Sequence, residues 1–110
     1  MNVDITPLTL PTSTIHHEVL KKFARKYVWW KTQEDALSMP ERVIAQVMDI
    51  GDYLDVQELA GEVGDETLRQ VLTHAQAGQF STRSWVYWHY RLGLSGAGEV
   101  PARPPVRSFA

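Results

Sequence analysis

Apolar residues recur with the spacing of an α-helix near the start of the chain. Basic residues fill the positions between them, so one side of this helix would be apolar and the other basic. Ser13 or Thr14 carries a side-chain oxygen that can cap the first turn. The pattern predicts an amphipathic helix over residues 14–27, preceded by an extended lead over residues 1–13. The apolar positions of this helix are Ile15, Val19, Leu20, Phe23 and Tyr27.

A second helix is indicated further along by its start and stop signals. Ser38 is followed by Pro40 and Glu41, which gives a serine N-cap, a proline in the first turn and a glutamate at the third helical position. This is the capping-box arrangement, and the helix would end at Gly51. Its apolar stripe consists of Val43, Ile44, Val47 and Met48, with Ile50 at the end.

Two more helices follow at once, each bounded by a glycine. Asp52 caps the third helix, which ends at Gly64, and Asp65 caps the fourth. Three short helices in a row, separated by two glycines, are the clearest structural signal in the chain. The inward positions of these last two helices are Val56, Leu59, Ala60 and Val63, and then Leu68, Val71, Leu72 and Ala75.

The last predicted helix is rich in aromatic residues. Gly78 interrupts the chain, and a serine cap within residues 81–84 then precedes Trp85, Trp88 and Leu92. The spacing of these three side chains favours a helix, although the alternation of residues in this segment also fits a strand. We expect His89, which lies among them, to be a packed or hydrogen-bonded residue at the edge of the core.

These elements predict an all-α protein, a compact bundle of about five short helices. The expected organisation is an extended lead over residues 1–13, a single helical domain over residues 14–93 and a flexible, Pro/Gly-rich C-terminal arm over residues 94–110. The length of 110 residues and the hydrophobic content of 44% agree with one domain that buries its own core.

Composition removes several classes of chemistry. The chain has no cysteine, which excludes disulfides, thiol catalysis and cysteine-ligated metals, and it lacks a phosphate loop or a nucleophile elbow. The four histidines lack the spacing of a metal site or a general base. Asp49, Asp52 and Asp55 recur every three residues, but they straddle Gly51 and fit helix caps better than a cation site. We therefore expect no catalytic residue, no cofactor and no metal, in a protein that is not an enzyme.

The net charge of −2 conceals an uneven distribution. Residues 1–31 carry +3, residues 32–79 carry −8 and residues 80–110 carry +3. The first residues lack the features of a secretory signal, and no apolar run is long enough to cross a bilayer. We expect a cytoplasmic protein that does not bind membranes, with an acidic middle between basic ends.

One segment of the acidic middle is similar to a DNA-binding motif. Residues 57–64 resemble the first helix and turn of a helix-turn-helix, but Asp65 follows Gly64 directly, and the apolar Leu68 and Val71 come about two residues early. The outward positions of the following helix carry one firm positive charge, which disfavours DNA binding. These positions are Glu66, Thr67, Arg69, Gln70, Thr73 and His74.

The aromatic residues are numerous for a chain of this length. We expect the run from Tyr27 to Trp30 to be buried by a short loop as an anchor. For the whole set two alternatives stay open: all of it belongs to the core, or part of it forms a partner surface, where tryptophan and tyrosine dominate binding. The set comprises Trp29, Trp30, Trp85, Tyr87, Trp88 and Tyr90.

A longer pattern runs through residues 42–52 (RVIAQVMDIGD), Leu59, Gly64, residues 68–72 (LRQVL) and residues 80–88 (FSTRSWVYW). This pattern, which covers about residues 27–92, resembles a group of small bacterial proteins of an uncharacterised domain type. Such proteins are often encoded beside nucleotidyltransferase toxins of the abortive-infection type and are regarded as their antitoxins.

The resemblance implies a non-enzymatic protein-binding module that blocks such a toxin. A toxin that handles nucleotides or RNA needs a basic active-site region, which the acidic middle can meet while the arm gains order on binding. A DNA-binding regulator and a structural homodimer held by exposed aromatic residues stay open as alternatives. The residues expected to contact the partner are Asp55, Glu58, Glu62, Glu66, Arg69, Trp88, Arg107 and Phe109.

Overall fold

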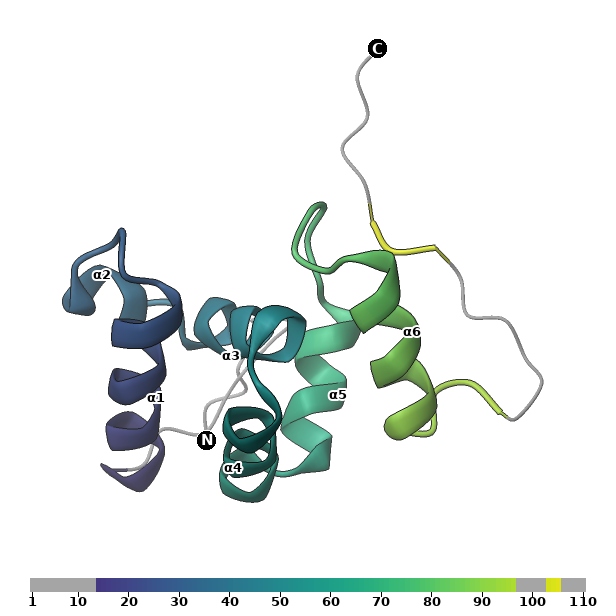
Figure 1. The fold of residues 1–110 in the computed structure, drawn as a ribbon, viewed down its shortest axis with the longest axis horizontal. Coiled ribbons are helices and arrows are strands. Elements are labelled where there is room, and N and C mark those ends of the chain that lie inside the picture. The colour runs from purple at the N-terminus through teal and green to yellow at the C-terminus, as the bar shows by residue number, and fades with distance from the viewer. Residues whose placement is uncertain (1–13, 97–102, 106–110) are drawn as a thin grey trace, which may run out of the picture.

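The fold was analysed in a computed structural model, which describes residues 14–96 and 103–105. These residues form helices and loops without any strand, so the all-α prediction is confirmed (Figure 1). The predicted lead over residues 1–13 lies outside the described residues. The helices are α1 (Thr14–Tyr27), α2 (Gln33–Leu37), α3 (Pro40–Ile50), α4 (Tyr53–Val63), α5 (Asp65–Thr73) and α6 (Thr82–Arg91).

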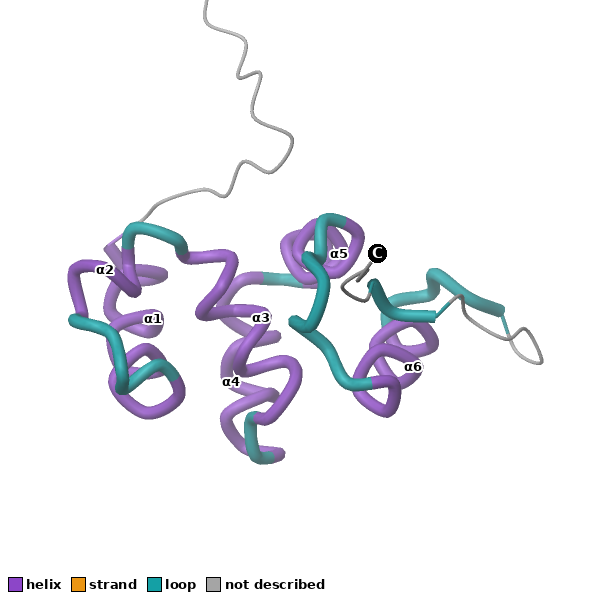
Figure 2. The backbone as a smooth tube through the Cα atoms, turned by 90° about the horizontal axis from the view of Figure 1, so that it is seen from above, coloured by secondary structure: helices purple, strands orange, loops and turns teal. Residues whose placement is uncertain are grey.

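Helix α3 is the centre of the bundle. It packs against each of the other five helices, as Figure 2 shows from above. Burial on more than one side requires apolar residues at neighbouring positions, because a stripe at helical spacing covers one face only. The five buried residues of α3 are Val43, Ile44, Ala45, Val47 and Met48.

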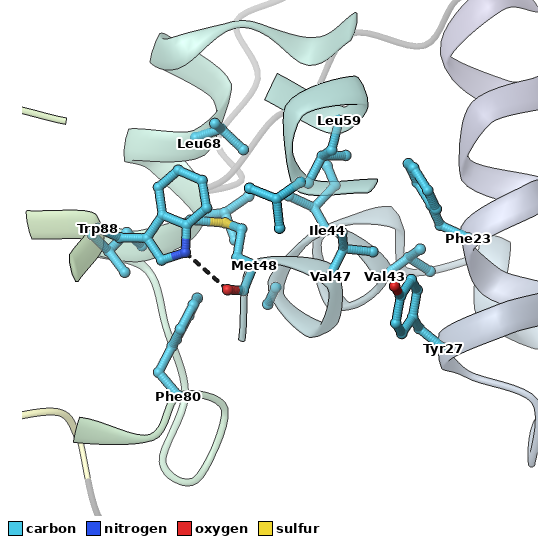
Figure 3. Packing of buried hydrophobic residues seen from close by; sticks show 14 of the residues in the cluster. Phe23, Tyr27, Val43, Ile44, Val47, Met48, Leu59, Leu68, Phe80 and Trp88 are labelled. Carbon is cyan, nitrogen blue, oxygen red and sulfur yellow. Dashed lines mark hydrogen bonds between the residues drawn. The ribbon is translucent and has the colours of Figure 1, made fainter. Parts of the chain in front are cut away.

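Helix α6 is attached to the bundle through the carboxyl end of α3. Trp88 is 1% exposed, and its indole N–H donates a hydrogen bond to the Met48 carbonyl oxygen at 2.9 Å (Figure 3). Asp49 accepts hydrogen bonds from the Ser81 backbone N–H and the Ser84 hydroxyl, so a side chain of α3 binds the first turn of α6. The indole bond satisfies a donor that would be costly to bury alone.

Most of the predicted helix boundaries are confirmed. Asp52 accepts a hydrogen bond from the Asp55 backbone N–H and caps α4, and Ser81 caps α6 in the same way. Gly51 ends α3, and Gly64 ends α4. Gly64 has a φ of 84°, and this left-handed conformation lets α5 begin at the next residue.

Two predicted caps are wrong. Ser38 does not cap α3, because it is the C-cap residue that follows α2 and its hydroxyl donates to the Asp35 carbonyl oxygen; Met39 precedes α3 without a side-chain cap. Asp65 is the first residue of α5, and Gly64 occupies the N-cap position instead. Both errors have one cause. The N-cap position lies one residue away from the side chain that could cap the helix, at Met39 for α3 and at Gly64 for α5.

Helix α2 was not predicted, and it accounts for the sixth helix. It is five residues long, too short for an apolar stripe to show in the sequence. Its start is nevertheless marked locally, because the Thr32 side chain accepts a hydrogen bond from the Asp35 backbone N–H at 3.1 Å.

A short part of the C-terminal arm contacts the helical domain. Pro104 is buried, and the Gly78 backbone N–H donates to the Pro105 carbonyl oxygen at 3.2 Å. Residues 103–105 therefore lie against the loop that joins α5 to α6.

Two glycines predict opposite responses to alanine. A Cβ at Gly61, on the exposed side of α4, would meet no atom within 4 Å, so Gly61→Ala should stabilise the protein by about 0.5–1 kcal/mol. A Cβ at Gly51 would collide with the Val47 carbonyl oxygen, so Gly51→Ala should destabilise it by about 1 kcal/mol or more. Urea unfolding of both variants measures the difference, and an equal or reversed response would contradict this packing.

Candidate functional site

The basic side of α1 faces acidic residues of α4. The ammonium group of Lys22 lies 2.6 Å from the Glu58 Oε1 atom. The ammonium group of Lys26 lies 2.7 Å from Asp55 and 3.1 Å from Asp52. Lys22 and Lys26 are four residues apart and so share one face of α1. These ion pairs join two helices that are distant in the sequence.

Tyr27 lies at the inner end of this cluster. Its hydroxyl donates to Asp55 Oδ2 at 2.6 Å and accepts from the Asp52 backbone N–H at 3.1 Å. The Asp55 side chain is only 16% exposed, so this carboxylate depends on partners within the protein. We call Lys26, Tyr27, Asp52 and Asp55 the α1–α4 cluster.

The ionisation of the cluster follows from its hydrogen bonds. Bonds from Lys26 and then Tyr27 lower the pKa of Asp55, while the bond from the Asp55 backbone N–H and the contact with Lys26 lower the pKa of Asp52. Asp55 and Asp52 raise the pKa of Lys26. Burial and the bond to Asp55 raise the pKa of Tyr27. All four groups therefore keep their ordinary charge state near neutral pH.

These contacts involve two of the acidic residues that are expected to contact a partner. Asp55 and Glu58 both pair with lysines of α1; the Asp55 carboxylate is largely buried, whereas the Glu58 side chain is 43% exposed. Glu66 is exposed and pairs with Arg69, whose Nε–H also donates to the Leu92 carbonyl oxygen at 2.9 Å. Glu62 is half-buried at the end of α4. Of the acidic residues expected to contact a partner, Glu62 and Glu66 lie at the junction of α4 and α5.

Trp88, which is expected to contact a partner, is buried in the folded domain. Its side chain is enclosed between α3, α5 and α6 and has no surface to offer (Figure 3). Arg107 and Phe109, the remaining expected contacts, lie outside the described residues. The expected position of His89 is confirmed, because it is half-buried, stacks near Trp85 and hydrogen-bonds the Trp85 carbonyl oxygen.

The described residues, 14–96 and 103–105, contain no cluster that could hold a metal ion. No three acidic or histidine side chains converge there. Of the three aspartates expected to act as caps, Asp52 caps α4, while Asp49 binds the start of α6 and Asp55 binds Lys26 and Tyr27. Helices α4 and α5 are joined by Gly64 alone, and Arg69, the one cation of α5, is engaged within the domain.

The prediction that the run after α1 is buried is wrong for both tryptophans. Tyr27 and Val28 are buried, whereas Trp29 and Trp30 are 74% and 55% exposed. The Lys31 backbone N–H bonds back to the Val28 carbonyl oxygen, which closes a turn with the two indoles on its outside. The two rings touch edge to face with centroids 5.8 Å apart. Of the aromatic set, Trp85 and Trp88 form core, and the other four residues are exposed.

A groove begins beside Trp30. It has a volume of about 640 Å³ and runs between the turn after α1, helix α3 and the loop that follows α5. Met39, 43% exposed, lies on its wall together with Arg42 and Asp35. A smaller hollow of about 260 Å³ lies on the Trp29 side, between Arg25, Lys31 and Gln33. We call Arg25, Trp29, Trp30, Lys31 and Met39 the tryptophan surface.

A second exposed apolar patch lies at the junction of α3 and α4. Ile50, Tyr53 and Leu54 are exposed there, and a groove of about 460 Å³ separates Tyr53 from Tyr87 of α6. Arg91 donates to the Tyr87 hydroxyl and to the Gln57 side-chain oxygen, so these two polar groups beside the groove are paired. This patch provides a comparison for the tryptophan surface.

Neither a protein-family model, a curated protein nor a solved structure gives a significant match to this chain. The family resemblance seen in the sequence therefore stays a prediction. None of the helices within the described residues has both the length and the apolar character needed to cross a membrane.

Replacing Tyr27 by phenylalanine tests the α1–α4 cluster. The variant removes the donor to Asp55 and the acceptor for the Asp52 N–H, so it should lower the free energy of unfolding by about 1–3 kcal/mol. Tyr53→Phe is the matched control, because the Tyr53 side chain is exposed, and it should change stability by less than about 0.5 kcal/mol. Equal effects of the two variants in urea unfolding would show that the Tyr27 hydroxyl contributes nothing.

The pKa shifts predict how stability changes in acid. Because the pKa values of Asp52 and Asp55 are lowered by folding, their stabilising effect is complete above the unfolded-state value of about 3.9 and is lost as pH falls through the folded values. Lys26→Met removes the cation that lowers both, so this variant should lose less stability than wild type between about pH 5 and pH 2. Lys31→Met, which removes an unpaired lysine, should follow the wild-type curve. Parallel acid curves for Lys26→Met and wild type would contradict the assignment.

Proposed function

We propose that this protein is a protein-binding module that acts as the antitoxin of a nucleotidyltransferase-type toxin. The observation that carries the binding part is the tryptophan surface, where two neighbouring tryptophans and a methionine are exposed beside a groove. Exposing large apolar side chains in water is unfavourable, and contiguous patches of them mark interaction sites. Covering this surface with a partner would remove that cost.

The composition of the surface favours a protein as the partner. Tryptophan, methionine and arginine are the residues enriched in the buried centres of protein interfaces, and all three occur here in Trp29, Trp30, Met39 and Arg25. The indoles are held on a closed turn next to the buried Val28, so they are positioned before a partner arrives. A preorganised side chain loses little conformational entropy on binding.

The class of partner rests on the sequence pattern. Residues 42–52, 68–72 and 80–88 carry the resemblance to the proteins encoded beside nucleotidyltransferase toxins. The acidic residues at the α4–α5 junction support this class, since a negative patch accelerates association with a basic nucleotide-binding region. Glu62, Asp65 and Glu66 form this patch, and contacts of Arg107 and Phe109 with the toxin stay a prediction.

Co-expression with the product of the adjacent reading frame tests the proposal. The wild-type chain should co-elute with that product and relieve its toxicity. Trp29→Ala combined with Trp30→Ala should weaken binding by at least about 30-fold, because an interface tryptophan commonly contributes about 2 kcal/mol or more. Tyr53→Ala, at an equally exposed aromatic residue of the second patch, should leave binding unchanged.

The outcomes of this experiment separate two questions. If wild-type protein neither co-elutes with the neighbouring product nor restores growth, the antitoxin assignment is wrong. If binding occurs but survives loss of both tryptophans, the toxin contacts another surface.

A further inference from the structure

We propose that the tryptophan surface binds an acidic segment of its protein partner, one in which aspartate or glutamate flanks a large apolar side chain. The proposal rests on the proposed function and gives the chemistry of the partner at this site. It differs from the expectation that the acidic middle of the chain makes the main contact with a basic partner.

The basic residues in and just after α1 fall into two groups, one paired with acidic residues and one not. Lys22 and Lys26 face α4 and are neutralised by Glu58, Asp52 and Asp55. Arg25, on another face of α1, and Lys31, in the turn after it, form no ion pair with any described residue. Two cations without an ion-pair partner among the described residues thus lie beside the exposed tryptophans.

The hollow next to Trp29 is lined by hydrogen-bond donors that suit a carboxylate. Arg25, Lys31 and Gln33 line it together with the Trp29 ring. The guanidinium and ammonium groups carry donors only, and the Gln33 amide nitrogen is held by a bond to the Lys21 carbonyl oxygen at 3.2 Å. A carboxylate is the protein group that accepts from both cations at once, and arginine binds it through two parallel hydrogen bonds.

The groove on the Trp30 side binds the apolar residue of the partner segment. Met39, Val43 and Ala45 provide apolar lining there, and Lys31, Asp35 and Arg42 line the same groove. Asp35 opposes a carboxylate in this groove, whereas the residues that line the hollow beside Trp29 include Arg25 and Lys31 and none that is acidic. The segment therefore lies with its acidic residue in the hollow beside Trp29 and its apolar residue in the groove beside Trp30.

A nucleic acid fits this surface less well than an acidic peptide does. Binding a phosphate backbone needs several cations along its path, and here Arg25 and Lys31 are followed directly by the acidic Glu34 and Asp35 at the start of α2. Two cations are enough to bind one carboxylate group, but they neutralise few of the phosphates along a nucleic-acid chain. We therefore assign the surface to a protein segment.

Charge reversal at Arg25 and Lys31 tests the inference. Arg25→Glu combined with Lys31→Glu should weaken binding of the purified adjacent-frame product at least about 10-fold, and the affinity of the wild-type chain should fall as salt is raised. Arg83→Glu reverses an exposed cation of α6 as the matched control and should leave the affinity unchanged. Unfolding curves of all variants confirm that each remains folded.

A photo-crosslinking amino acid in place of Met39 identifies the partner segment directly. The cross-linked peptide should contain more acidic than basic residues together with a large apolar residue. A basic cross-linked peptide, or undiminished binding by the charge-reversed variant, overturns the inference while the antitoxin proposal stands if Trp29→Ala and Trp30→Ala still weaken binding. Tryptophan-dependent binding of a single-stranded oligonucleotide in place of the protein would also overturn it.

Discussion

Burial of helix α3 is the constraint on which the rest of the structure depends. Its apolar residues occupy neighbouring positions, so a single partner helix could not cover them, and five helices surround it instead. The carboxyl end of α3 then positions two of these neighbours. Only Gly51 and Asp52 separate α3 from α4, and Asp52 caps α4; the Met48 carbonyl oxygen and the Asp49 carboxylate hold α6.

The position of α4 decides which lysines of α1 are paired within the domain. Once α4 lies beside α1, Lys22 and Lys26 are bound by Glu58, Asp52 and Asp55, and the basic and acidic parts of the chain neutralise each other over this contact. Exposed ion pairs of this kind contribute little stability, but they remove charge from the set available to a partner. Arg25 and Lys31, beside the tryptophans, form no ion pair with any described residue.

Features encoded locally were predictable from the sequence. The first helix, its bounds, the caps at Asp52 and Ser81 and the glycines that end α3 and α4 all depend on short-range patterns, and the structure contains them. The exposure of Trp29 and Trp30 was missed because hydrophobicity favours burial, whereas the turn at Val28 allows only that residue to point inward. The pairing of Asp55 with Lys26 was missed because it depends on the packing of α1 against α4. Thr32 and Asp35 were a usable signal for α2, since their spacing is that of a capped helix start.

The central claim is that a protein partner covers the two exposed tryptophans and leaves the two buried ones in place. The indole N–H signals of the four tryptophans in an NMR titration with the adjacent-frame product test it most directly. The account predicts that the signals of Trp29 and Trp30 shift or broaden on binding, while those of Trp85 and Trp88 stay where they are. Binding that moves only backbone signals of residues 62–66, with all four indoles unchanged, would contradict it.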